Sequence, residues 1–184
     1  AASDVYKRQL EASEALRNKM INQNRDIVSA PIQTLTLLPR PVAAMRNKIL
    51  WALEKNNIEA LRIPIDWNEV RPIFAKSLSL KASPDPIDIL KNQSFDGHGQ
   101  EILRLLHTVL AQPFVKILRG SVTLYEWPAC AHSPTQFDAP DDWQTRWQCV
   151  RFADLERSNK IGRPCIMRLG VASDGVWHYF WSED

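Results

Sequence analysis

The sequence predicts an α+β domain in which an N-terminal helical hairpin and further helices pack on a small antiparallel sheet that ends in a C-terminal β-hairpin. Apolar residues recur at spacings of three and four in residues 42–56 and 100–111, as in helices with one buried face. In residues 164–181 two β-type segments flank a turn sequence, as in a hairpin. The 184 residues are 45% hydrophobic and 24% charged, values that favour one folded core over disorder.

The first residues of the chain match a translated sequencing adapter. Residues 4–9 read DVYKRQ, which is one translation of GATGTGTATAAGAGACAG, a transposon end used in sequencing libraries. We therefore expect residues 1–9 to be an adapter scar that replaces the native N-terminus, and we exclude them from the fold. Residues 10–40 are expected to be a helical extension followed by a proline-containing linker. Residues 41–184 are expected to form a single α+β domain.

The first two helices of this domain are expected to form a hairpin. The first covers residues 42–56 and ends at two asparagines, because asparagine tolerates the left-handed conformation of a helix end. The second begins at Ile58 and is expected to stop before Pro64. A third helix is expected at residues 83–90, and the most strongly patterned helix covers residues 100–111.

The second half of the domain is expected to be rich in β-structure. Strands are expected at residues 115–118 and 122–127, short helices at 141–148 and 153–160, and a short strand at 150–152. The sheet is expected to close with the C-terminal hairpin.

The turn of this hairpin permits two registers. A two-residue turn places Leu169 opposite Phe180, whereas a three-residue turn with a left-handed Gly175 places Leu169 opposite Tyr179. We prefer the three-residue turn because a buried face normally sets the register. It gathers six apolar side chains on one face: Met167, Leu169, Val171, Trp177, Tyr179 and Trp181.

Charge and cysteine patterns argue against several functional classes. The net charge of +2 is small and no basic tract exists, so we expect no nucleic-acid partner. No apolar run reaches the roughly 18 residues of a membrane helix, so no transmembrane segment is expected. Cys130, Cys149 and Cys165 lack metal-ligand spacing, so we predict no metal site and no cofactor. Buried apolar thiols are favoured for these cysteines, while a disulfide between two of them is left open.

The segment most typical of a functional site reads DGHGQE at residues 96–101. Asp96, His98 and Glu101 are candidate acid–base residues, and together they are also candidate ligands of a cation. The alternative, which we favour, is that Asp96 caps the following helix and the glycines permit the turn.

Tryptophan is abundant for a chain of this length. Trp127, Trp143 and Trp147 are candidates for lining a groove that binds a peptide or glycan, because aromatic faces stack on apolar ligand surfaces. The favoured alternative is that these tryptophans belong to the core.

Several segments together resemble a family of alphaproteobacterial exported proteins of unknown function. They are residues 45–50, 57–62, 67–69, 85–87, 96–103, 125–128, 168–171 and 174–180, and the likeness covers residues 41–184. The resemblance implies a periplasmic or exported protein whose signal peptide is lost with the native N-terminus. The family pattern has an acidic residue where His98 stands and aromatic residues near Cys130, so it assigns no role to either, and it supplies no catalytic residues.

These observations favour a non-catalytic cell-envelope domain that binds an unidentified ligand or envelope protein. The first alternative is an envelope hydrolase that uses Asp96, His98 and Glu101, with or without a metal ion. The second alternative is a purely structural domain.

The adapter hypothesis makes a testable prediction. Deleting residues 1–9 should leave the midpoint of thermal unfolding unchanged within error, because residues foreign to the protein have no place in its core. Circular dichroism melting of the full and shortened chains measures this. A fall of several degrees on deletion would contradict the hypothesis.

Overall fold

The α+β prediction is confirmed by a computed structural model, which describes residues 26–75, 85–132 and 140–182. In these ranges a five-stranded antiparallel sheet has the order β1-β2-β3-β4-β5, so each strand lies beside its neighbour in sequence. The strands are β1 (Ile27–Val28), β2 (Val115–Arg119), β3 (Val122–Trp127), β4 (Met167–Ala172) and β5 (Trp177–Ser182).

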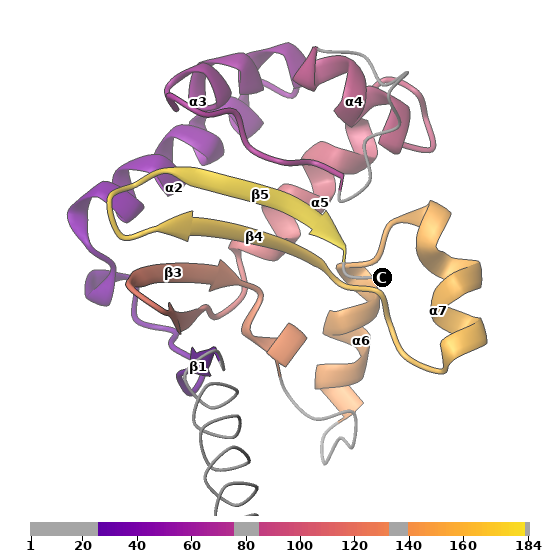
Figure 1. The fold of residues 1–184 in the computed structure, drawn as a ribbon. Coiled ribbons are helices and arrows are strands. Elements are labelled where there is room, and N and C mark those ends of the chain that lie inside the picture. The colour runs from indigo at the N-terminus through magenta and orange to yellow at the C-terminus, as the bar shows by residue number, and fades with distance from the viewer. Residues whose placement is uncertain (1–25, 76–84, 133–139, 183–184) are drawn as a thin grey trace, which may run out of the picture.

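The helices cover one face and one end of this sheet (Figure 1). The α-helices are α2 (Arg40–Glu54), α3 (Arg62–Asp66), α4 (Pro86–Gln93), α5 (Gln100–Leu110), α6 (Pro140–Gln148) and α7 (Leu155–Ile161). The 3-10 helices are η1 (Leu35–Leu37), η2 (Ile58–Leu61), η3 (Ala129–His132) and η4 (Phe152–Asp154). In the part of the chain that the structure describes, no helix combines the length and apolar composition that crossing a bilayer requires.

Helices α2 and α5 pack against each other and against β4, and they lie behind the sheet in Figure 1. The predicted apolar stripe of α5 is fully buried in this layer: Ile102, Leu105, Leu106 and Val109. Opposite it lie the largest side chains of the core: Trp127, Trp177 and Phe180 of the sheet, and Phe114, which directly precedes β2. Burying each such side chain contributes roughly 1.5–3 kcal/mol, so this layer holds the fold together.

The end of the helical hairpin differs from the prediction. The chain after Asn57 forms η2 and then α3, and α3 runs through Pro64 to Asp66 instead of stopping before the proline. Pro64 lies in the first turn of α3, where its missing N–H has no intrahelical acceptor to bond. The proline is therefore compatible with the helix start that it occupies.

The segment expected to be a linker is partly bonded to the sheet. Ile27 and Val28 pair with Leu118 and Ile117 of β2. Ile32 then exchanges backbone hydrogen bonds with Phe114 at 2.7 and 2.9 Å. Ile27, part of the expected helical extension and linker, is thus in a strand, while residues 1–25 lie outside the described ranges. The domain start near residue 41 stays a prediction.

The C-terminal hairpin has the predicted turn but a different register beyond it. Gly175 is left-handed (φ +91°) and Val171 pairs with Trp177, as the three-residue turn requires. At Gly170 and Val171 the register shifts through a β-bulge, which leaves His178 without a cross-strand partner on β4. Beyond the bulge, Leu169 pairs with Phe180. The predicted face of six apolar residues was wrong, because one extra residue in β5 turns the following side chains over.

The bulge divides the aromatic residues of β5 between the two faces of the sheet. Trp177 and Phe180 are fully buried against the helices. Tyr179 and Trp181 lie on the opposite face, where their rings stack at 4.6 Å with an interplanar angle of 7°. The hairpin therefore contributes to two separate environments.

Trp177 should be essential for stability. Its side chain is fully buried, and its Nε1 donates to the carbonyl of Tyr179 at 3.0 Å. Trp177→Ala should lower the free energy of unfolding by about 3–5 kcal/mol, because burial of a large aromatic is lost. His178→Ala should have a far smaller effect, since that side chain is exposed. Urea titration of both variants measures the difference, and equal losses would contradict this account of the hairpin.

Candidate functional site

Asp96 of the predicted site caps the N-terminus of α5. Its Oδ1 accepts hydrogen bonds from the backbone N–H groups of His98 (2.7 Å) and Gln100 (3.2 Å). Its Oδ2 accepts from the N–H of Glu101 (2.8 Å) and from Ser94 Oγ (2.7 Å). Burial by itself would raise the pKa of Asp96, but these four donors outweigh it and hold the pKa well below its usual value. The carboxylate stays ionised as a helix cap.

Glu101 points inward and bonds to backbone groups as well. Its side chain is buried, with Oε2 accepting from the N–H of Phe95 at 2.9 Å and Oε1 from that of Phe152 at 2.6 Å. The two phenylalanines belong to segments far apart in sequence, and their rings approach to 5.5 Å. Glu101 therefore ties the loop before α5 to η4.

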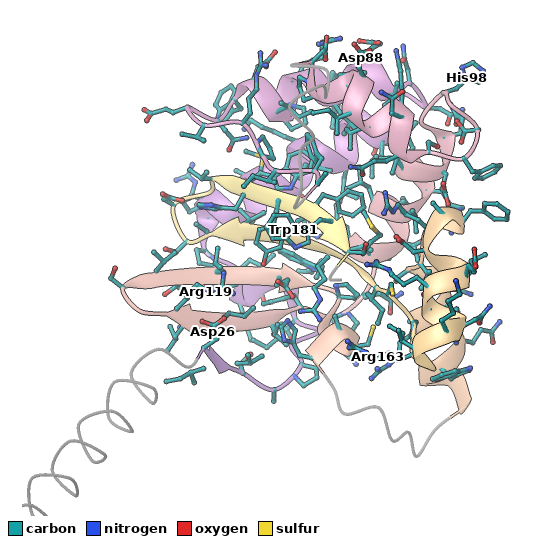
Figure 2. The ribbon with its side chains drawn as sticks, turned by 45° about the vertical axis from the view of Figure 1, so that its right-hand side comes forward. Asp26, Asp88, His98, Arg119, Arg163 and Trp181 are labelled. Atoms are coloured by element: carbon teal, nitrogen blue, oxygen red, sulfur yellow. The ribbon has the colours of Figure 1, made fainter. Side chains whose placement is uncertain are left out.

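His98 does not join the two carboxylates in a common site. Its imidazole is exposed, and Figure 2 places it at the periphery of the molecule. Across residues 26–75, 85–132 and 140–182, no three His, Cys, Asp or Glu side chains gather in a way that would hold a metal ion. In the structure this loop caps the N-terminus of α5, and Glu101 ties it to η4.

The three candidate tryptophans lie in different environments. Trp127 is fully buried and its ring lies 5.3 Å from that of Phe114, so it belongs to the core. Trp143 and Trp147 meet edge to face on α6 at 5.7 Å, and Trp143 is 40% exposed. The structure therefore brings together Trp143 and Trp147 but not Trp127.

A groove of about 720 Å³ lies between α2, residues 67–73 and the turn between β4 and β5. Met45, Asn68 and Trp177 are its buried lining residues. Trp67, Val70 and Ile73 line it too, although they are 68%, 75% and 46% exposed. We call this surface the Trp67 groove. Large apolar side chains clustered at an exposed concave surface are typical of binding sites.

The wall that carries Trp67 is fastened to the sheet. The Nδ2 of buried Asn68 donates to the carbonyls of Pro64 and Ile65, while its Oδ1 accepts from the N–H of Trp177 at 2.8 Å. Further along, Ile73 bonds to the backbone of β5 on both sides of Tyr179. Trp67 directly precedes the first anchor and Val70 lies between the two, so these exposed side chains are carried by a fastened segment.

Comparison with models of protein families, with curated protein sequences and with solved structures gives no match. The candidate site therefore rests on the geometry of this chain.

Sequence reasoning missed the Trp67 groove. In the sequence Trp67 is an aromatic residue within residues 67–69, one of the segments of the family resemblance, and neither feature indicates a groove. The groove needs α2, this segment and the hairpin turn, which are far apart in the chain, and no local pattern shows that they meet. The contact between α2 and this segment, in which Lys48 Nζ lies 4.1 Å from the centroid of the Trp67 ring, becomes visible only in the structure.

The cap formed by Asp96 predicts a pH-dependent contribution to stability. Asp96→Ala should lower the free energy of unfolding by about 0.5–2 kcal/mol at pH 7, as for other lost helix caps. A carboxyl whose pKa is lowered on folding stabilises fully above its unfolded value, here 3.8, and less as the pH falls below it. The difference between the wild type and the variant should therefore shrink from pH 7 to pH 3.

Urea titrations at the two pH values measure this difference. Asp66→Ala is the matched control, because this acid is exposed at the end of α3 and should change stability by less than about 0.5 kcal/mol at both pH values. The free energy of unfolding of the Asp96 variant lies below that of the wild type. If this difference stays constant or grows from pH 7 to pH 3, the proposed role of the ionised cap is refuted.

Proposed function

We propose that this protein is a non-catalytic cell-envelope domain that binds an amphipathic small molecule in the Trp67 groove. The observation that carries the proposal is the cluster of Trp67, Val70 and Ile73, exposed side by side along a groove of about 720 Å³. This volume lies within the roughly 300–1,000 Å³ typical of small-molecule sites. The envelope location is part of this proposal, and its support is the family resemblance of the sequence.

The charges around the groove favour an amphipathic occupant over a purely apolar one. Lys48 and Arg71 line it together with Glu69 and Asp174, so both signs of charge surround the apolar surface. An apolar group packed on Trp67 and Ile73 would be removed from water, while polar groups of the ligand would meet these charges.

The hydrolase alternative gains no support at the loop before α5. Asp96 and Glu101 direct their carboxylates at backbone N–H groups, and His98 faces solvent. General acid–base chemistry requires such groups within hydrogen-bond reach of one reacting centre. The purely structural alternative makes a different prediction from ours, because it expects no saturable ligand binding at the groove.

Binding of Nile red, a neutral dye whose fluorescence rises in apolar surroundings, tests the proposal. The full chain should give a saturable rise in fluorescence. Trp67→Ala should weaken the affinity by up to about tenfold, because one aromatic contact contributes about 0.5–1.5 kcal/mol beyond area burial. Since Trp67 is mostly exposed, the variant should keep its fold, as circular dichroism would show.

Trp51→Ala is the matched control for this experiment. Trp51 is also exposed (45%) and also carries a lysine over its ring, with Lys55 Nζ at 4.7 Å, but it does not line the groove. Its replacement should leave dye binding unchanged. Equal effects of the two substitutions, or a signal that never saturates, would overturn the proposed function. If the groove bound a protein and no small molecule, the proposed class of ligand would be wrong.

A further inference from the structure

A second hollow lies on the face of the sheet opposite α2 and α5, above the buried side chain of Glu126. This carboxylate is 4% exposed and has side-chain partners on two sides. Its Oε2 accepts the hydroxyl hydrogen bond of Tyr179, and its Oε1 lies 2.5 Å from His132 Nε2. Arg168 Nη1 lies 3.6 Å from the same Oε1. A carboxylate this deeply buried requires such partners, because an unpaired buried charge is strongly destabilising.

The strand register brings these groups together. Glu126, Gly170 and Tyr179 lie in one row across β3, β4 and β5. A Cβ atom at Gly170 would lie 2.3 Å from Tyr179 Cζ, so only glycine lets the tyrosine ring cross β4 to reach Glu126. Burial, and then the negative charge of Glu126, raise the pKa of Tyr179, so its hydroxyl remains a donor.

The hollow above this cluster is a cavity of about 250 Å³, which we call the Glu126 cavity. Asp26 and Arg119 form its second charged group, with Arg119 Nε and Nη2 donating to the Asp26 carboxylate at 2.6–3.1 Å (Figure 2). These hydrogen bonds hold the pKa of Asp26 below its usual value. Trp181, stacked on Tyr179, supplies an aromatic wall, and the apolar lining is Val28 and Ile117.

The charges of this lining point to a ligand that carries both signs. With His132 of the lining counted as neutral, two carboxylates, Asp26 and Glu126, and two guanidinium groups, Arg119 and Arg168, sum to zero. An ion of a single sign would meet like charge at close range, whereas a zwitterion can place each of its charges beside the opposite one. The volume lies below the range typical of drug-sized ligands, so the ligand is small.

We propose that the Glu126 cavity binds a zwitterionic metabolite, specifically a free α-amino acid with an apolar side chain. Its ammonium group is placed beside the carboxylates of Asp26 and Glu126, and its carboxylate beside Arg119 and Arg168. Its side chain contacts Trp181, Val28 and Ile117. This site goes beyond the proposed function, because its lining shares no residue with that of the Trp67 groove.

Isothermal titration of the full chain with L-leucine and L-phenylalanine tests the proposal. At least one of the two should bind saturably. L-Leucinamide, which lacks the carboxylate, and 4-methylpentanoate, which lacks the ammonium group, should bind at least tenfold more weakly than L-leucine. No saturable binding of either amino acid, or equal binding of a singly charged analogue, overturns the proposal.

Variants locate the binding within the molecule. Arg119 is largely exposed, so Arg119→Met should keep the fold, and it should weaken amino-acid binding at least tenfold. Arg163→Met is the matched control, because Arg163 is an exposed arginine that follows α7 outside the cavity (Figure 2). Binding that survives Arg119→Met but is lost in Trp67→Ala would place the ligand in the groove and overturn this inference while leaving the proposed function intact.

Discussion

The β-bulge at His178 decides which side chains of β5 face the helices and which face away from them. Without it, strict alternation would place Trp177, Tyr179 and Trp181 on one face. With it, Trp177 and Phe180 enter the core while Tyr179 and Trp181 turn to the opposite side. The carbonyl of His178 accepts the N–H of Ile73 at 2.8 Å, which fastens the wall of the Trp67 groove. The core, the groove and the Glu126 cavity therefore all depend on one inserted residue.

Glycine at position 170 is the second requirement of this arrangement. Glu126 sits on β3 and Tyr179 on β5, with β4 between them, so their side chains can meet only across a residue that has no side chain. If Tyr179 could not cross, Glu126 would lose the hydroxyl donor of its buried carboxylate. Replacing a partner of a buried charge destabilises far more than removing an exposed contact. Gly170 is thus required for a buried hydrogen-bond network and not for a turn.

Local patterns in the sequence were enough for the features that depend on neighbours in the chain. The stripe of α5, strand β3 and the turn at Gly175 follow from periodicity and from the backbone freedom of glycine. The bulge could not be predicted from the sequence, because the local pattern permitted two registers. The structure combines them: Val171 pairs with Trp177 as in one, and Leu169 pairs with Phe180 as in the other. The groove and the cavity each require three or more elements that are distant in sequence, and single-sequence reasoning has no signal for such meetings.

The contrast between the carboxylates explains why the predicted site and the inferred one differ. Asp96 and Glu101 bond to backbone N–H groups and fasten loops. Buried Asp154 bonds to Arg151, Arg157 and Ser182, which joins η4 to the end of β5. Glu126 also has side-chain partners, but those partners come from three different elements and surround a hollow. A loop sequence rich in acids and glycines indicates local capping, whereas a recognition site needs polar side chains that the sheet register brings to one place.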